Sequence, residues 1–307
     1  MDKPLLSIVI ANYNYGRFLE AAISSVIAQD MGNMVELIIC DAASTDDSVE
    51  IIKKYANGLP PNQFFSDWAK NNSLLMTYDQ QSATKITWWC SEPDSGQSEA
   101  FNKGFSHATG RFLTWLNADD VLLPGVVKSL HEMTQNRPDI HWVTGNLIKF
   151  EQHNGRVLEA PWGPHWVPAW AQRPGFPLSV FGPTTFWSRE AYLKVGPIDE
   201  TLHYVMDTDY WMRLVNAGYR YRRLNRVCWG FRLHEVSKTA IYTDHEPSPE
   251  VRRKIDCERA KIYKKNGFYI TVRGRVIASL LRIMDGSRVV DIFRRTFVQG
   301  RKVSFKF

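Results

Sequence analysis

The segment Ser7-Ile-Val-Ile-Ala11 decides the fold of this chain. It is a short run of apolar, mostly β-branched residues, and it leads into the polar turn Asn12-Tyr-Asn-Tyr-Gly16. Over residues 18–29, apolar residues then recur at the spacing of one helix face. The predicted order is therefore strand, loop and helix.

The same order is repeated in the residues that follow. Residues 35–40 predict a second buried strand, residues 41–47 a polar loop, and residues 48–55 a second helix. Two successive strand–helix units are typical of the α/β class, in which a mostly parallel sheet is flanked by helices. Ligands bind at the carboxyl ends of such strands, so we expect residues 11–15 and 41–46 to border one crevice.

The rest of the chain divides into a body and a tail. Helices are predicted at 97–108, after Pro124 and at 207–217, and strands at 112–116, 141–150 and 184–188. Residues 58–87 are polar, aromatic and poorly periodic, as expected of an insertion. We expect a body over residues 1–245 and a C-terminal extension over residues 246–307, formed by two or three basic amphipathic helices with breaks near Gly267 and Gly286.

Composition limits the class of protein. With 307 residues, 44% of them hydrophobic, the chain is long enough for one large domain with a substantial core. No window approaches about eighteen uncharged apolar residues, and the first residues do not form a basic, apolar leader. The four cysteines are widely spaced and form no metal-binding or disulfide pattern. We therefore expect a cytoplasmic protein with reduced thiols.

Charge is unevenly divided along the chain. The net charge is +6, but residues 252–307 carry 16 Lys and Arg against 4 Asp and Glu, so the remainder is net acidic. A basic tail points to an anionic partner, either a membrane surface or nucleic acid, and no nucleic-acid-binding motif accompanies it. Apolar residues and arginines between Val272 and Met284 have the spacing of an interfacial helix. The alternative is a helix that packs on the body with its arginines in solvent.

The acidic run Asn117-Ala-Asp-Asp120 follows the strand predicted at 112–116. Two adjacent carboxylates at a strand end can hold Mg²⁺ or Mn²⁺ and leave coordination positions for phosphate oxygens and water. Taken alone, such a run is also typical of the residues that cap a helix. Its meaning therefore depends on the other motifs of the chain.

Seven motifs occur in one order along the chain. They are Ser7 to Asn14, Asp41 with Ser44-Thr-Asp46, Asp94-Ser-Gly-Gln97, Asn102-Lys-Gly104, Thr109-Gly110, Leu116 to Asp120 with Pro124-Gly125, and Val205 to Leu214 with Arg232-Leu-His234. In this order they closely resemble the family 2 inverting glycosyltransferases, over about residues 5–130 and again over 196–239. The resemblance implies the GT-A fold, a Rossmann-like fold of nucleotide-diphospho-sugar transferases, for the body.

The resemblance also implies an activity. A sugar would be moved from a UDP- or dTDP-sugar to a hydroxyl of a glycan or of a lipid-linked acceptor, with a divalent cation, Mn²⁺ or Mg²⁺, as cofactor. Surface polysaccharide synthesis is the expected context. The basic tail would then place the enzyme on the inner face of the cytoplasmic membrane.

Three strand ends supply the donor site that the resemblance implies. Ala11 and Tyr13 match positions that line the nucleotide pocket, where a tyrosine ring can stack on the base. Asp41 matches an aspartate that accepts a hydrogen bond from the base, a role suited to the imide N–H of uracil or thymine. Asp94 and Gln97 match donor-site positions whose contacts vary.

The acidic run is given specific roles by the same resemblance. Asn117 stands at the first place of the family's acidic signature, where it is neutral and is expected to support its neighbours. Asp119 is expected to face the ribose or the donor sugar, and Asp120 to ligate the metal. His234 matches a histidine near the diphosphate that ligates the metal or touches phosphate.

Asp207 matches the family's general base, which removes the proton from the acceptor hydroxyl as that hydroxyl attacks the anomeric carbon. A single in-line displacement with the base on the acceptor side inverts the anomer. Asp209 is the alternative base or a supporting carboxylate. Helix capping is the alternative role of Asp207.

Some positions depart from the family pattern. Ala42 and Ala43 stand where an acidic residue and a glycine are usual. Trp162, Trp166 and Trp170 have no family counterpart, and their rings either contact the acceptor sugar or anchor their loop.

Two other functions compete with the transferase. The first is an inactive nucleotide-sugar-binding module of the same fold, and the joint presence of Asp41, Asp119, Asp120 and Asp207 speaks against it. The second is a sugar nucleotidyltransferase, which needs a glycine-rich N-terminal loop that residues 11–17 do not supply.

Overall fold

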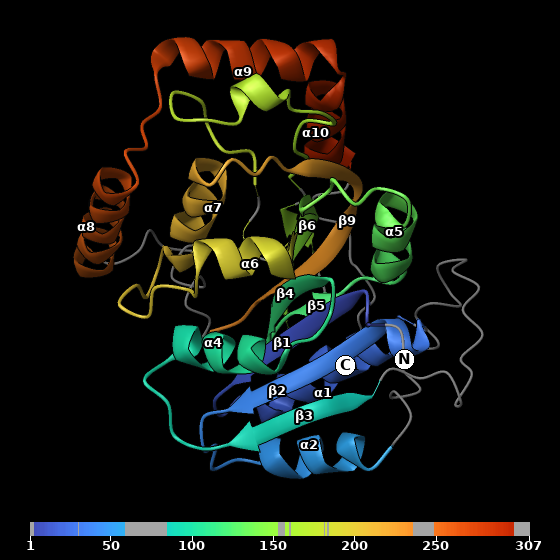
Figure 1. Cartoon of the computed structure of the whole chain (residues 1–307). Coiled ribbons are helices and arrows are strands. Elements are labelled where there is room, and N and C mark those ends of the chain that lie inside the picture. The colour runs from blue at the N-terminus through green and yellow to red at the C-terminus, as the bar shows by residue number, and fades with distance from the viewer. Residues whose placement is uncertain are drawn as a thin grey trace.

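The structure of the protein is a computed structural model (Figure 1). It describes residues 3–29, 31–58, 85–152, 157–159, 161–180, 182, 184–235 and 249–297. Most of the insertion expected at 58–87 lies outside the described residues.

A nine-stranded sheet forms the centre of the described part of the chain, in the order β3-β2-β1-β4-β8-β6-β9-β5, with β7 paired to β6. Its strands are β1 (Leu6–Asn12), β2 (Val35–Asp41), β3 (Ile86–Ser91), β4 (Phe112–Asn117), β5 (Val121–Leu122), β6 (Trp142–Glu151), β7 (Val157–Glu159), β8 (Thr185–Ser188) and β9 (Arg222–Leu233). The four strands β3, β2, β1 and β4 are parallel, β8 is antiparallel to its two neighbours, and β6 and β9 are again parallel. The predicted α/β class with a mostly parallel sheet is confirmed.

Helices cover both faces of this sheet. They are α1 (Gly16–Ile27), α2 (Ser48–Ala56), α4 (Gln97–His107), α5 (Val126–Thr134), α6 (Arg189–Val195), α7 (Met206–Asn216), α8 (Pro249–Lys265), α9 (Val272–Met284) and α10 (Ser287–Phe297), with short 3-10 turns η1 (Gly32–Met34) and η2 (Ala169–Ala171). Side chains alternate along β1, so that Ile8 and Ile10 pack in the core under α1, α2 and α5, while Val9 packs under α4. Strands β1, β2 and β4 are buried on two faces, which explains their continuous apolar sequences, whereas β3 at the edge of the sheet is only partly buried.

The order of the strands creates a crevice. From β1 the chain passes to β2 and β3 on one side, and it then returns to β4 on the other side of β1. Ala11 near the end of β1 lies opposite Asn117 at the end of β4. The loops that follow these two strands therefore diverge, and such a switch point is where open α/β sheets bind ligands.

One of the sequence motifs, Asn102-Lys-Gly104, shapes this framework and does not line the crevice. The amide of Asn102 donates to the carbonyl of Ile198 and accepts from its N–H, both at 2.9 Å, which ties α4 to the loop before α7. A Cβ at Gly104 would lie 2.3 Å from Val9 Cγ1, so only glycine lets α4 approach β1 this closely.

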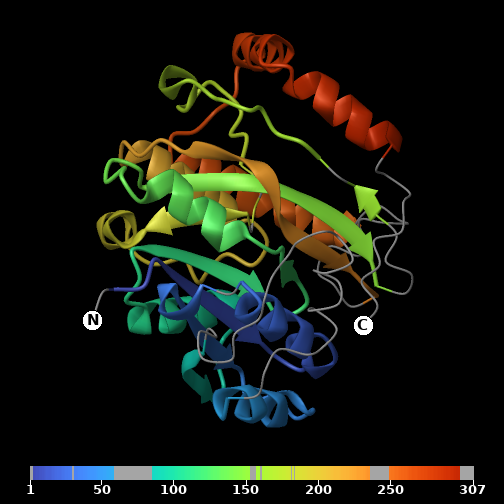
Figure 2. The ribbon, with the colours of Figure 1, turned by 90° about the vertical axis from the view of Figure 1, so that its right-hand side faces the viewer.

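Within residues 249–297, the C-terminal extension forms three helices, in agreement with the two or three that the sequence predicts. Gly267 and Gly286 break the helical stretch with positive φ angles of 59° and 76°. Ile255 and Ile262 of α8 are buried in the same core as α7. Figures 1 and 2 show α9 and α10 at the end of the molecule opposite to α2.

Candidate active site

A cleft of about 640 Å³ lies at the switch point between β1 and β4. Its size is within the usual range for small-molecule sites. Six of the predicted site residues line it, namely Ala11, Tyr13, Asp94, Gln97, Asn117 and Asp119. They come from the end of β1, the loop before α4, the start of α4 and the end of β4.

One part of the cleft suits a flat base. Tyr13 lines it with 59% of its surface exposed, which leaves the ring free to stack. Asp94 also lines it and accepts a hydrogen bond from the N–H of Gly96 at 2.9 Å. Burial raises the pKa of Asp94 above its ordinary value. Ala42 lies in the same lining and carries no polar side chain.

Asp41 does not line the cleft, in contrast to the sequence-based expectation. It is buried, and Oδ1 accepts a hydrogen bond from Asn12 Nδ2 at 2.7 Å. Oδ2 accepts from Ser91 Oγ at 2.6 Å and from the N–H of Ser44 at 3.0 Å. These donors come from the ends of β1 and β3 and from the loop after β2, so Asp41 joins the ends of three strands.

Asn117 links the cleft to the interior. Its Oδ1 accepts a hydrogen bond from Gln97 Nε2 at 2.7 Å, and its Nδ2 donates to Asp120 Oδ2 at 2.8 Å. An amide can do both at once, whereas a carboxylate can only accept. A neutral amide at position 117 can therefore bind both Gln97 and Asp120, which a carboxylate could not do.

Asp120 lies in the interior and not in the cleft. It has no exposed surface, and it accepts hydrogen bonds from Trp229 Nε1 at 3.1 Å and from the N–H of Arg232 at 2.9 Å, in addition to Asn117. Burial, and then repulsion by Asp119, raise the pKa of Asp120 well above its ordinary value. The assignment of Asp120 as metal ligand does not fit this position, because its oxygens face β9 and the amide of Asn117.

Asp119 is the carboxylate of the acidic run that lines the cleft. Its Oδ2 lies 3.0 Å from Nε2 of His234, although 115 residues separate the two in sequence. The imidazole is buried, with the rings of Tyr15 and Phe18 at 5.6 and 4.4 Å. Burial first, and then the charge of Asp119, raise the pKa of Tyr15 to about 12.

This pair has the chemistry of a divalent-cation site. Carboxylate oxygen and imidazole nitrogen both bind Mn²⁺, and Mg²⁺ is commonly held by one or two side chains together with phosphate oxygens and water. No group of three or more His, Cys, Asp or Glu that could hold a metal occurs among the described residues. A cation at Asp119 and His234 would therefore take its other ligands from a bound diphosphate and from water.

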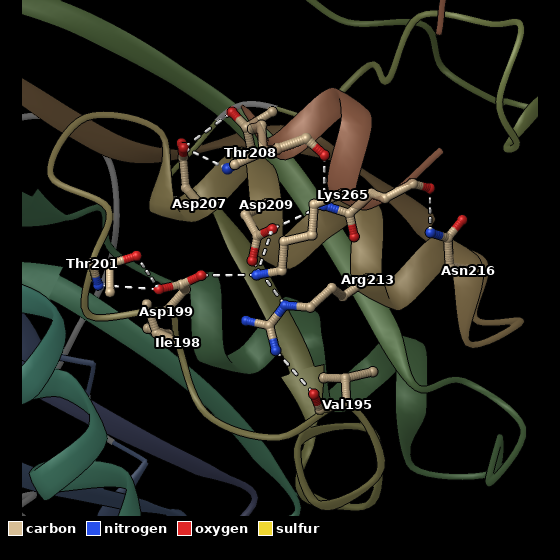
Figure 3. A network of polar contacts seen from close by, with 12 residues as sticks. Val195, Ile198, Asp199, Thr201, Asp207, Thr208, Asp209, Arg213, Asn216 and Lys265 are labelled. Carbon is tan, nitrogen blue, oxygen red and sulfur yellow. Dashed lines mark hydrogen bonds and ion pairs between the residues drawn. The ribbon is translucent and has the colours of Figure 1, made fainter. Parts of the chain in front are cut away.

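Asp207 lies in the first turn of α7 and is half-buried (Figure 3). The N–H and the hydroxyl of Thr208 both donate to Oδ1, at 2.6 and 3.1 Å. Within the described residues, no hydrogen bond is formed to Oδ2, which lies 2.9 Å from the position that a Cβ on Gly182 would occupy. Burial raises the pKa of Asp207.

The helix of Asp207 begins next to the cleft. The hydroxyl of Ser98 donates to the sulfur of Met206 at 2.9 Å, and Ser98 directly follows Gln97, which lines the cleft. Asp207 itself is not among the lining residues of the cleft. It therefore stands beside the donor cleft and not inside it.

Asp209 is a different kind of residue, as Figure 3 shows. It is fully buried, and its two oxygens contact Arg213 Nε at 2.9 Å, Asn266 Nδ2 at 2.8 Å and Lys265 Nζ at 3.5 Å. These contacts join α7 to the end of α8. The alternative in which Asp209 is the base does not fit this geometry, because its oxygens face inward.

Comparison with known proteins identifies the family. The family model described as "Glycosyl transferase family 2" matches residues 7–72 and 90–192, which is more than half of the chain. The chain belongs to this family. It is therefore a glycosyltransferase.

Relatives and solved structures agree with this conclusion. An uncharacterized glycosyltransferase of Methanocaldococcus jannaschii is 24% identical over 79% of this chain and 78% of its own length. The structure of S. aureus TarS 1-349 in complex with UDP-GlcNAc is similar in fold, with a TM-score of 0.57, 15% identity and coverage of 84% of this chain and 72% of that chain. The mannosyltransferase PcManGT of Pyrobaculum calidifontis, in complex with GDP-Man and Mn²⁺, gives a TM-score of 0.51 at 12% identity and covers 97% of this chain and 88% of its own.

The site of the glycosyltransferase also contains contacts that the sequence did not predict. Arg232 Nε donates to the carbonyl of Asp119 at 2.7 Å, and Trp229 Nε1 donates to the carboxylate of Asp120. Strand β9 therefore holds the acidic loop in place. Tyr15 completes the surroundings of His234. Only the Arg-Leu-His motif pointed to β9, and it could not show that the strand reaches the acidic loop. Across the described residues, no helix has both the length and the apolar character needed to cross a membrane.

Proposed function

We propose that this glycosyltransferase is a metal-dependent inverting enzyme that moves a sugar from a UDP- or dTDP-sugar to a hydroxyl of a glycan or lipid-linked acceptor. The contact at 3.0 Å between Asp119, which lines the donor cleft, and the buried His234 is the observation that carries the proposal. Surface polysaccharide synthesis at the inner face of the cytoplasmic membrane is the proposed context.

The base of the donor would lie between Tyr13 and Asp94. The exposed ring of Tyr13 offers a stacking surface, and the Asp94 carboxylate offers an acceptor for the imide N–H of uracil or thymine. Asp94 thus takes the role that the sequence gave to Asp41, whose oxygens are occupied by the strand ends. Ala42 leaves room for the base and makes no polar contact of its own.

Asp119 and His234 would hold Mn²⁺ or Mg²⁺ beside the donor diphosphate. When bound, the cation neutralises the charge that builds up on the departing nucleoside diphosphate. The protein keeps the two ligands in place through Arg232, which binds the backbone of Asp119, and through the rings around His234. Gln97 and Asn117 orient the adjoining wall of the cleft by their shared hydrogen bond.

Asp207 would act as the general base on the acceptor side. Its Oδ2 would take the proton of the acceptor hydroxyl while that oxygen forms a bond to the anomeric carbon and the bond from that carbon to the diphosphate oxygen breaks. Burial raises the pKa of Asp207, which makes the carboxylate a stronger base than an exposed aspartate. One displacement from the face opposite the diphosphate gives a β-linked product from an α-linked donor.

A thermal-shift panel of UDP-, dTDP- and GDP-sugars, measured with and without Mn²⁺, tests the proposal. Stabilisation by a uridine or thymidine donor that depends on Mn²⁺ is expected. A response to GDP-sugars alone would overturn the base assignment, and a response that ignores Mn²⁺ would overturn the metal assignment. Product anomers from the best donor, identified by NMR, test inversion separately.

A further inference from the structure

The outer face of α9 is apolar and open to solvent. Val272, Val276, Leu280 and Ile283 are all exposed, and they recur at the spacing that places residues on one face of a helix. Val272 is 79% exposed, and Met284 at the end of the helix is 82% exposed. Single exposed apolar residues are ordinary on protein surfaces, but a continuous stripe along a whole helix is not.

The next helix continues this apolar surface. Val289, Ile292 and Phe293 of α10 are exposed as well, each by more than half of its area. Figures 1 and 2 show that α9 and α10 together form one end of the molecule. Because α9 has 13 residues and α10 has 11, both are too short to span a bilayer but long enough to lie along its surface.

The charges of the two helices are sorted between the outside and the inside. Arg273, Arg275 and Arg288 are exposed, and Arg288 also lies 3.8 Å from Asp291. The only acidic residues of α9, α10 and the turn between them, Asp285 and Asp291, face the body. Asp285 Oδ2 accepts the N–H of His165 at 2.8 Å, and the buried Asp291 accepts the N–H of Trp162 at 3.1 Å. The solvent side is therefore apolar and positively charged.

Aromatic residues stand at both ends of the apolar stripe. Tyr269 precedes α9 and is 57% exposed, and Trp166, whose N–H donates to Asp285 at 3.3 Å beyond the other end of α9, is 55% exposed. Neither residue lines the donor cleft. Exposed Trp and Tyr next to an apolar, cationic surface are the side chains that settle in the headgroup region of membranes.

The surface is fixed to the rest of the enzyme. The carbonyl of Gly175 accepts the N–H of Thr271 at 3.0 Å, and the N–H of Gly175 donates to the carbonyl of Tyr269 at 2.7 Å. A Cβ on Gly274 would lie 1.9 Å from that Gly175 carbonyl oxygen, so α9 sits directly on the segment. This segment runs on to Gly182, which neighbours Asp207. Seven residues reach at most about 25 Å, so the start of α9 lies within that distance of Asp207.

We propose that the outer face of α9 and α10, with Trp166 and Tyr269, docks on an anionic lipid bilayer and lies in its interface. Burial of the apolar stripe would supply the binding free energy, and the arginines would select anionic headgroups. A second copy of the chain fits the surface less well, because the two faces brought into contact would both be positively charged. The proposal does not depend on the donor or metal assignments.

Flotation of the full-length protein with vesicles tests the proposal. We expect binding to phosphatidylcholine vesicles that also contain phosphatidylglycerol and much weaker binding to phosphatidylcholine alone. The double variant Val276→Glu with Leu280→Glu should lower the partition coefficient by about tenfold or more. Leu193→Glu, at an exposed leucine on α6, is the matched control and should bind as the wild type does.

A second pair of variants separates the contribution of charge. Replacing Arg273 and Arg275 by Glu should remove the preference for phosphatidylglycerol, whereas the same change at the exposed Lys53 and Lys54 of α2 should not. Absence of binding, or binding that survives the change at Val276 and Leu280, would overturn the proposal. A dimer in light scattering that dissociates in that double variant, together with no vesicle binding, would assign the surface to a second copy instead.

Discussion

Two pairs of aspartates, Asp119 with Asp120 and Asp207 with Asp209, look alike in sequence. In the structure, the two members of each pair differ in burial. In each pair one carboxylate is partly exposed, or open, and the other is fully buried among hydrogen-bond donors. Asp120 is held by an indole, a backbone N–H and an amide, and Asp209 by Arg213, Asn266 and Lys265. We propose that the open member takes part in the chemistry and that the buried member holds its loop or helix in place.

The difference between the members is a matter of desolvation. A buried carboxylate is stable only when several donors replace the lost water, and those donors leave no oxygen for a ligand. A half-buried carboxylate such as Asp207 keeps one oxygen without a hydrogen bond from the described residues, and burial still raises its pKa. Carboxylates two residues apart can therefore differ completely in role.

The largest expected effect belongs to Asp207→Asn. The amide cannot take the proton of the acceptor, so transfer should fall by about a thousandfold or more. Donor binding and thermal stability should stay close to wild type, because Thr208 can still donate to the remaining oxygen. Steady-state transfer assays with nucleotide titrations measure both. Loss of donor binding in this variant would mean that Asp207 is structural.

Asp119→Asn should follow, with a loss of transfer on the order of a hundredfold. Its specific signature is that nucleotide binding ceases to depend on Mn²⁺, since one of the two proposed ligands is weakened. Calorimetric titration of UDP with and without Mn²⁺ measures this. Asp256→Asn, at an exposed aspartate on α8, serves as control. Full metal dependence in Asp119→Asn would exclude Asp119 as a ligand.

The sequence predicted the strands around the cleft, and the residues at their ends, well. The strands β1, β2 and β4 and their helices rest on local signals, such as β-branched runs and helical spacing, and they emerged within two residues of their predicted ends. The cleft residues at these strand ends followed from the parallel topology alone. Six of the residues predicted around the donor and its diphosphate indeed line the cleft.

Which carboxylate is open could not be predicted, because the deciding partners are distant in sequence. Trp229 and Arg232 bury Asp120 from 109 and 112 residues away. They belong to β9, which has four arginines among its twelve residues and therefore lacks the apolar pattern of a buried strand. Asn266 and Lys265, which bury Asp209, lie beyond residues 236–248, which are outside the described part of the chain.

Asp209→Asn should affect stability more than chemistry. Removing the buried charge leaves Arg213 without its anion and weakens the joint between α7 and α8, which should cost on the order of 3 kcal/mol. Thermal and urea denaturation measure the loss. The transfer rate per folded molecule should stay within a few-fold of wild type at low temperature. A folded but inactive Asp209→Asn would return Asp209 to the list of candidate bases.

The pH dependence should separate Asp207 from an ordinary aspartate. Because burial raises its pKa, kcat/KM should fall tenfold per unit as the pH drops below that raised value. The carboxyl of Asp207 therefore binds its proton more tightly in the folded protein than in the unfolded chain. The contribution of this carboxyl to the free energy of unfolding falls as the pH rises through the same window. Asp207→Asn should lack that slope and should melt at an equal or higher temperature at neutral pH. A lower melting temperature would contradict the raised pKa.

The smallest effect should come from Asp94→Ala. Loss of one charged hydrogen bond to the base should weaken UDP binding by about tenfold. CDP should be nearly unaffected, because cytosine has no imide N–H to donate. Titrations of UDP and CDP in parallel therefore give an internal control that a general disturbance of the cleft would not reproduce. Equal losses for both nucleotides would remove Asp94 from base recognition, and they would leave stacking on Tyr13 as the main contact with the base.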